Sequence, residues 1–269
     1  MTMVQTTPVW RWEANRITAV TALALLPALA MAVAERGGAM IGPVALALGV
    51  WAVWAGMFAR LRGQPLAWDM IVPALVFVLM LPGAVPLWQQ GVALSFGLVL
   101  GGLIFGARGR GFVNPAVVAL AFLLFSFPGA TAGQPGLGVA IGAGLGGAVL
   151  LLLGLISGRV VLGFGLGLAA LMALQPAPDW AALTSATLAL GLVFLIADPV
   201  AAACTNVGRW VYGGLAGALV AVLGAGAAGV GALAPVVFAA LLASVFAALI
   251  DQMVIAANVR YRKGRQHHG

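Results

Sequence analysis

The chain has 269 residues, of which 63% are hydrophobic and only 7% are charged, and its formal net charge is +7. Because about a quarter of the residues in a soluble domain are charged, this composition excludes a soluble protein and indicates an all-α protein of the membrane. A helix that spans the bilayer needs about 20 mostly apolar residues, so the chain has room for about ten. Membrane topology explains the positive charge, so we expect the lipid bilayer, not nucleic acid, as a partner.

Ten apolar segments follow a polar, basic segment at residues 1–16. That first segment lacks a small-residue cleavage pattern, so we expect an uncleaved cytoplasmic N-terminal end. The predicted spans are residues 17–34, 39–59, 67–86, 89–106, 113–128, 137–156, 159–175, 180–198, 210–230 and 235–256.

The positions of the basic residues support this count. Loops on the cytoplasmic side of a membrane carry an excess of Lys and Arg. Ten spans with a cytoplasmic N-terminus place twelve of the 13 basic residues inside, and only Arg36, next to Glu35, falls outside. We therefore predict that both ends of the chain are cytoplasmic, in a multi-pass protein of the bacterial inner membrane.

Proline positions indicate that the two halves of the chain repeat one another. Pro82 lies 33 residues before Pro115, and Pro199 lies 36 residues before Pro235. Since each half has five spans, an odd number, the second half is inverted, and interrupted segments at matching positions of inverted halves indicate a binding site between them. The predicted parts are two five-helix repeats at residues 17–128 and 137–256, a short outer loop at 129–136, and a basic cytoplasmic tail at 257–269.

The chain has few residues that could hold a metal cofactor. Its single cysteine is Cys204, and both histidines, His267 and His268, lie in the C-terminal tail. An iron–sulfur cluster needs four ligands, mostly thiolates, and a haem between helices needs internal histidines. We therefore expect neither in this chain, which leaves a flavin or a quinone as the redox cofactor.

Three aspartates fall towards the cytoplasmic ends of predicted spans, namely Asp69, Asp198 and Asp251. Acidic residues inside a membrane are costly and mark ion or proton pathways. Asp251, the deepest, has two interpretations: it pairs with an arginine such as Arg209 at a helix end, or it is an ion or proton ligand.

The stretch at residues 104–122 combines a glycine-rich turn with two arginines and Asn114-Pro115. Glycine lets a backbone turn sharply or lie close to a planar ligand, and proline suits the first turn of the following helix. The stretch is either an ordinary basic loop between helices or a hairpin that contacts a cofactor or a quinone.

Three ordered motifs resemble a known family, which contains the NqrB component of the sodium-translocating NADH:quinone reductase (Nqr) and the RnfD component of the Rnf complex. They are the hairpin at residues 105–115, the Asp-Pro stretch at 194–213 and the C-terminal stretch at 249–260. The resemblance covers about residues 60–260. It implies a ten-helix, inverted-repeat subunit of an electron-transfer complex, working with other membrane subunits and coupled to sodium or proton movement.

The resemblance also implies cofactor sites. By this resemblance, FMN is expected on a threonine of an outer Ser-Gly-Ala-Thr motif, together with a second flavin. In Nqr the glycines of the hairpin lie by the quinone site. Here residues 129–131 keep Gly-Ala-Thr, but Pro128 replaces the serine and the outer loop is much shorter. Ala107 replaces the second glycine of the hairpin, and Gly111 replaces its asparagine. Thr131 is therefore either flavinylated or a plain loop threonine.

The resulting expectation is a membrane subunit that relays electrons through flavin (FMN or riboflavin) or quinone, with a tentative ion pathway at Asp69, Asp198 and Asp251. Two other hypotheses remain open: a channel or carrier for a small solute, and a structural subunit without a cofactor. The hairpin residues expected to bind cofactor are Phe105, Gly106, Arg108, Gly109, Arg110 and Asn114, and a matching cytoplasmic cluster is expected from Asp198, Thr205, Arg209 and Asp251.

Overall fold

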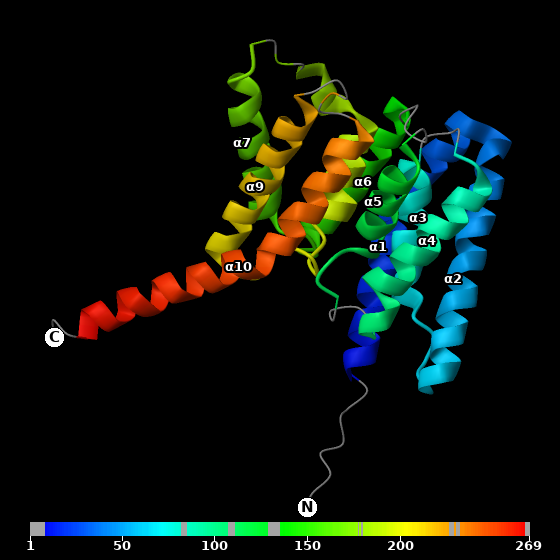
Figure 1. The fold of residues 1–269 in the computed structure, drawn as a ribbon, viewed down its shortest axis with the longest axis horizontal. Coiled ribbons are helices and arrows are strands. Elements are labelled where there is room, and N and C mark those ends of the chain that lie inside the picture. Colours follow the sequence, from blue (N-terminus) through cyan, green and yellow to red (C-terminus); the bar gives the residue numbers. More distant parts are fainter. Residues whose placement is uncertain are drawn as a thin grey trace, which may run out of the picture.

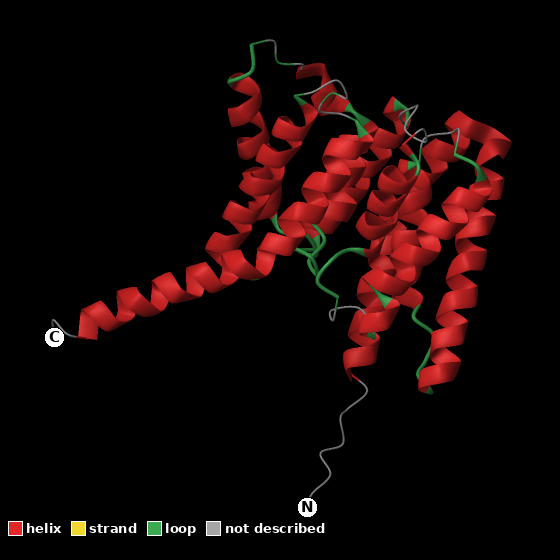
Figure 2. Cartoon of the chain, in the orientation of Figure 1, coloured by secondary structure: helices red, strands yellow, loops and turns green. Residues whose placement is uncertain are grey.

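The computed structural model describes residues 9–81, 85–106, 111–128, 135–176, 178, 180–225, 229 and 232–266. Among these residues every regular element is a helix (Figure 2), which confirms the predicted all-helical class. The α-helices are α1 (Val9–Arg36), α2 (Ile41–Arg62), α3 (Ile71–Met80), α4 (Leu87–Gly101), α5 (Pro115–Ser126), α6 (Leu137–Leu152), α7 (Gly158–Ala173), α8 (Ala186–Leu190), α9 (Asn206–Gly224) and α10 (Leu233–Gln266).

Each predicted apolar segment overlaps one of these helices in chain order. In the described part, four stretches are apolar and long enough to cross a membrane: Asn15–Arg62, which contains both α1 and α2, Leu87–Phe105, Asn206–Gly224 and Leu233–Tyr261. The remaining apolar helices are shorter, with 10–17 residues. The membrane class is therefore supported by helix length and composition, while the count of ten spans stays a prediction.

Helices α1 and α6 pack closely because small residues face one another along both. A Cβ atom built on Gly142 would lie 2.6 Å from the Cα of Ala28, and one on Gly146 would meet the carbonyl oxygen of Ala24. These residues are spaced four apart in each helix. Small residues at this spacing let two backbones approach directly, as in other helix pairs of membrane proteins.

Glycines make two further close helix pairs. Between α7 and α9, a Cβ on Gly163 would lie 2.7 Å from the carbonyl oxygen of Trp210. Between α4 and α5, a Cβ on Gly97 would lie 2.6 Å from the carbonyl oxygen of Pro115, and one on Gly101 would lie 2.7 Å from the Cα of Pro115. The second pair fixes the start of α5, which carries part of the site.

The packing order of the first five helices recurs in the last five. Helix α4 packs on α5, as α9 packs on α10, and α2 packs on α4, as α7 packs on α9. Helix α1 packs on α3, as α6 packs on α8. The two sets meet where α1 contacts α6 and α5 contacts α10.

Successive helices alternate in direction, and the last part of α10 extends away from the bundle (Figure 1). Helix α10 continues to Gln266, so the segment expected as a polar tail begins as helix. We call the end at which α2 finishes and α5 and α9 begin the cavity end, since the cavity described below lies there. Arg60, Arg62, Arg159 and Arg209 lie at this end, and Glu35 and Arg36 lie at the opposite end.

Candidate functional site

Helix α8 is interrupted at the cavity end. It continues as a π-helical turn, Gly191–Ile196, in which the N–H of Ala197 donates to the carbonyl of Leu192 at 2.8 Å. The bond of this type from residue 199 to the carbonyl of Phe194 cannot form, because Pro199 has no N–H. Residues 197–205 are therefore not helical, and the chain re-enters a helix only at α9. Single π-turns inside α-helices are frequent at functional sites.

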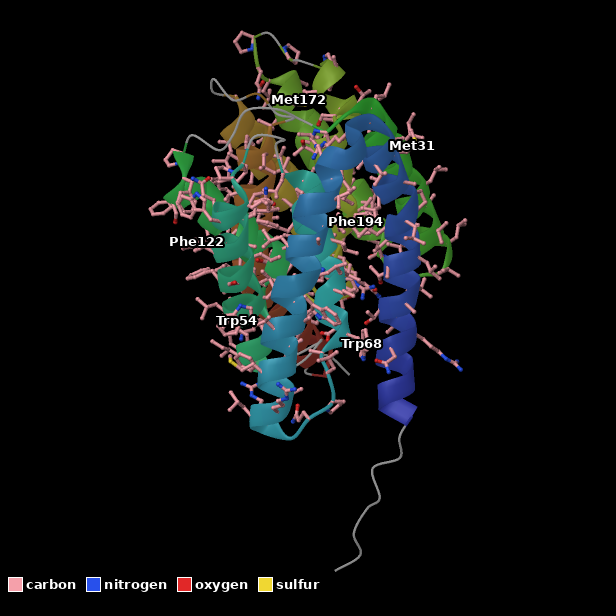
Figure 3. All side chains as sticks on the ribbon, turned by 90° about the vertical axis from the view of Figure 1, so that its right-hand side faces the viewer. Met31, Trp54, Trp68, Phe122, Met172 and Phe194 are labelled. Carbon is pink, nitrogen blue, oxygen red and sulfur yellow. The ribbon has the colours of Figure 1, made fainter. Side chains whose placement is uncertain are left out.

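Side chains from two other helices complete the broken end. The buried hydroxyl of Tyr212 in α9 donates to the carbonyl of Ile196 at 3.1 Å. The amide Nδ2 of Asn114 donates to the carbonyl of Phe194 at 2.9 Å. Phe194 is buried among the helices (Figure 3). Buried carbonyls need such partners, because an unpaired one costs a desolvation penalty.

Asn114 also begins α5. Its Oδ1 accepts from the N–H of Ala116 at 2.9 Å, as an N-cap residue does, and Pro115 takes the first helical position. Its Nδ2 makes a second bond, of 2.8 Å, to Oδ2 of Asp198. Asn114 is 7% exposed. One buried amide therefore joins the start of α5 to the break after α8.

Asp198 is half-buried, and its carboxylate accepts hydrogen bonds at both oxygens. Oδ1 accepts from the N–H of Val200 at 3.1 Å, and Oδ2 accepts from Asn114. Hydrogen bonds to a carboxylate stabilise its charged form. The structure thus brings together two residues that the sequence analysis assigned to different clusters.

Asp69 lies in the short 3₁₀ turn Trp68–Met70, just before α3. The indole N–H of Trp51 in α2 donates to the carbonyl of Ala67 at 3.0 Å, and the rings of Trp51 and Trp68 lie 5.3 Å apart. These contacts fix the turn, and with it the position of the Asp69 side chain.

A cavity of about 70 Å³ lies where these segments meet. Asp69, Asn114 and Asp198 line it, together with Thr21 from α1, and most of the other lining side chains are apolar. Its walls come from α1, α3, α4, α5, the end of α6 and the segment after α8. The volume has room for about five water molecules, since each needs about 10–15 Å³.

The hairpin between α4 and α5 adjoins this cavity. Three glycines at its base line the cavity wall: Gly101, Gly102 and Gly111. The rings of Phe105 and Phe112 meet edge to face at 5.6 Å, and both are partly exposed. Gly106 has φ +99°, a conformation that glycine adopts easily. The other hairpin residues predicted to bind cofactor, Arg108, Gly109 and Arg110, lie outside the described residues.

Arg62 in α2 contacts the base of the hairpin, which the sequence analysis did not predict. Its guanidinium donates to the carbonyls of Leu103 and Ile104 at 2.6 and 2.9 Å and lies 4.9 Å from the ring of Phe58. Cations near a helix C-terminus interact favourably with its carbonyls. The spacing of Phe58 and Arg62, one helical turn apart, was the available signal, but nothing in the sequence indicated the contact with residues 103–104.

The remaining predicted residues form a separate cluster at the start of α9. Asp251 in α10 accepts from the N–H of Cys204 at 2.7 Å, and from the N–H and hydroxyl of Thr205 at 2.9 and 2.6 Å. Thr205 in turn caps α9 by accepting from the N–H of Gly208. The Nε of Arg209 donates to the carbonyl of Ala203. This geometry favours the helix-end interpretation of Asp251, in which backbone donors hold the carboxylate and the nearby Arg209 charge also acts on it.

The outer loop is described only at its edges. Thr131, the predicted flavin site, lies outside the described residues. On the near side of the loop, the ring of Phe127 meets Trp88 edge to face at 5.3 Å. On the far side, Glu35 accepts from the N–H groups of Gly136 and Gly138 at 3.1 and 2.9 Å. Glu35 therefore holds the start of α6 at the end of the bundle opposite the cavity.

The fold and the cavity define a class: an apolar helical bundle with a small, carboxylate-containing cavity between its two halves. The sequence comparisons identify the family. The NQR2, RnfD, RnfE family matches residues 4–134 and 129–260, so the chain belongs to it, as the motifs predicted.

Curated relatives are named as the B subunit of Na(+)-translocating NADH-quinone reductase. The protein from Pseudomonas aeruginosa is 33% identical over 79% of this chain and 66% of its own length. Those from Ectopseudomonas mendocina and Yersinia pestis are 30% identical, over 86% and 79% of this chain and 70% and 65% of their own lengths. The chain thus spans about two thirds of the length of these relatives.

Proposed function

We propose that this protein is an integral membrane subunit of an electron-transfer complex related to the sodium-translocating NADH-quinone reductases. In this proposal it works beside other membrane subunits of the bacterial inner membrane and couples electron transfer to movement of Na⁺ or H⁺. Family membership favours this function over a solute carrier and over a purely structural subunit.

The observation that carries the proposal is the polar junction in the cavity. Asp198 and Asn114 bond to each other, and Asp69 lines the same small space among apolar side chains. Acidic residues within membrane-spanning segments are costly and usually mark ion or proton pathways. We therefore assign the cation pathway to Asp69 and Asp198 first, with Asp251 further along the same end of the bundle.

The size of the cavity limits what it can hold. About 70 Å³ is small beside the volumes of about 300–1,000 Å³ of pockets for drug-sized ligands. It suits a small cation with a few waters. Among the described residues, no three His, Cys, Asp or Glu side chains gather into a metal site, so a cation here would rely on backbone oxygens and water as well.

We assign the redox groups to two surfaces outside the cavity. The exposed rings of Phe105 and Phe112 offer a stacking surface for a quinone or flavin at the cavity end. Arg108 and Arg110, from the same hairpin sequence, would pair with an anionic group of that cofactor, such as a phosphate. Thr131, in the predicted outer loop that follows Phe127, would carry FMN. When bound, these groups supply the one-electron and two-electron redox chemistry, which the side chains of the protein lack.

Two observations support the proposed inverted repeat with cytoplasmic ends. Helix packing recurs in the same order in both halves. Arginines gather at the cavity end, which the positive-inside rule assigns to the cytoplasm. Cation entry from the cytoplasm through the cavity would follow from this orientation.

The test of the flavin assignment is a denaturing gel under illumination, with intact mass, on the complex purified with its partner subunits. Wild type, Thr131→Ala and a control, Thr184→Ala, are compared. Thr184 is an exposed threonine at the end of the bundle opposite the cavity, and its hydroxyl donates to the carbonyl of Ala181. We expect a fluorescent band with an FMN mass increment that only Thr131→Ala loses. An unmodified wild-type mass would contradict covalent flavin on this chain.

A further inference from the structure

Asn114 connects the two segments to which we assign redox and cation functions. Its buried amide donates from Nδ2 to the carbonyl of Phe194 and to the carboxylate of Asp198, residues that lie 80 and 84 positions later. Its Oδ1 accepts a hydrogen bond within α5, from the N–H of Ala116. A primary amide has two N–H donors, and here both bonds cross to the other half of the chain.

On the hairpin side, Asn114 has little freedom to move alone. A Cβ on Gly111 would lie 3.1 Å from the carbonyl oxygen of Gly101, and one on Gly101 would lie 2.7 Å from the Cα of Pro115. The neck of the hairpin is therefore closed by direct backbone contact. Since close-packed segments transmit displacements instead of absorbing them, a shift of the hairpin reaches Asn114.

On the cation side, the end of α8 depends on Asn114. The carbonyl of Phe194 has no helical partner at Pro199, and one oxygen of Asp198 receives the Asn114 amide. Helices kink at π-turns, so the direction of the chain after Phe194 depends on the contacts that hold this turn. A shift of Asn114 would therefore change both the turn and the orientation of the Asp198 carboxylate.

We infer that Asn114 is the positioning residue that couples the redox hairpin to the cation pathway, by setting the orientation of Asp198. The inference rests on the proposed function. A ligand at the hairpin and a cation at Asp198 would both change the same hydrogen bonds of Asn114. Each ligand would therefore change the affinity of the other by the same factor. In this role Asn114 acts through Asp198.

The test compares Asn114→Ser with wild type in the whole complex reconstituted in vesicles. Serine keeps an oxygen that can cap α5 but loses both donated bonds to the second half. We expect electron transfer from NADH to quinone to continue, while the Na⁺ taken up per electron falls about tenfold, within the 5–150-fold range usual for coupled sites. The Na⁺ concentration for half-maximal turnover rises by a similar factor.

Ser185→Ala is the matched control, because Ser185 caps the other end of the same interrupted helix through the N–H of Leu188. It should leave both Na⁺ readouts unchanged. If Asn114→Ser does not assemble, Asn114→Thr replaces it, because threonine also caps helices and lacks the amide.

A double variant separates positioning from a general loss of structure. Because Asn114 acts through Asp198, adding Asn114→Ser to Asp198→Asn should change the Na⁺ dependence no further than Asp198→Asn alone. Independent, additive effects would overturn the inference, as would a wild-type Na⁺ dependence in Asn114→Ser. If electron transfer by the wild-type complex did not depend on a cation, the proposed function would be contradicted, and the inference that rests on it as well.

Discussion

Two carboxylates at the cavity end, Asp198 and Asp251, are held in opposite ways. Asp198 lines a cavity, and a side chain from the other half of the molecule holds it in place. Asp251 receives two backbone N–H groups and the hydroxyl of Thr205, and it fastens the start of α9 to α10. An aspartate bonded mainly to backbone secures a chain path, whereas one bonded to a distant side chain beside a cavity can respond to a ligand.

The largest effect that this comparison predicts is on turnover. Asp198→Ala removes a carboxylate from the cavity wall, so cation-coupled quinone reduction by the complex should fall by about a hundredfold, equivalent to about 2.7 kcal/mol in activation free energy. Turnover is measured at saturating NADH and quinone. Glu35→Gln, a carboxylate change at the opposite end of the bundle, serves as the control, and an equal loss in both would contradict a local role for Asp198.

Asp251→Ala should lower the stability of the protein more than it lowers turnover. The change removes three hydrogen bonds to a carboxylate that is only partly buried, so we expect the free energy of unfolding to fall by about 2–4 kcal/mol. Thermal unfolding in detergent measures the loss, and hydrogen exchange should show increased opening around Cys204 and Thr205. Unchanged protection there would mean that Asp251 does not hold the start of α9.

A smaller effect is expected at Thr205, whose hydroxyl both caps α9 and donates to Asp251. Thr205→Val should cost about 1 kcal/mol or somewhat more, as the loss of an N-cap does. Thr205→Ser keeps the hydroxyl and should unfold close to the wild-type temperature. Equal unfolding temperatures for the two variants would contradict the capping role.

The smallest effect is expected at Arg62, which holds the carbonyls of Leu103 and Ile104 at the base of the hairpin. Arg62→Gln should lower stability by about 1 kcal/mol and weaken quinone affinity by raising its KM, with Na⁺ dependence unchanged. Arg60→Gln, on the same helix end, is the control. A change in the Na⁺ dependence of Arg62→Gln would connect Arg62 to the cation pathway and contradict its assignment to the hairpin alone.

The sequence predicted the helices well, because hydropathy marks each apolar segment directly. It predicted α3 and α8 as longer than they are. Pro199 marked the end of α8 in the sequence, but the π-turn at Gly191–Ile196 that precedes it carried no sequence signal. The motifs also singled out Asn114 and Asp198. Their bond, across 84 positions, could not be predicted, because it exists only when α5 and α8 are packed together.

Grouping residues by their spacing in the chain was less successful. Asp198 and Thr205 are seven residues apart and were expected in one cluster, but the non-helical segment between them directs the first towards the cavity and the second towards α10. Contacts such as that of Arg62 with residues 103–104 carry no sequence signal, since a carbonyl group is present at every residue.

The most direct measurement is NADH-driven uptake of radioactive Na⁺, per electron transferred, by vesicles containing the wild-type complex, Asp198→Asn or Glu35→Gln. We predict coupled uptake for wild type and Glu35→Gln, and a ratio at least about tenfold lower for Asp198→Asn. A ratio for Asp198→Asn equal to that of wild type, or a wild-type complex that moves neither Na⁺ nor H⁺, would contradict the assignment of the cation pathway to this cavity.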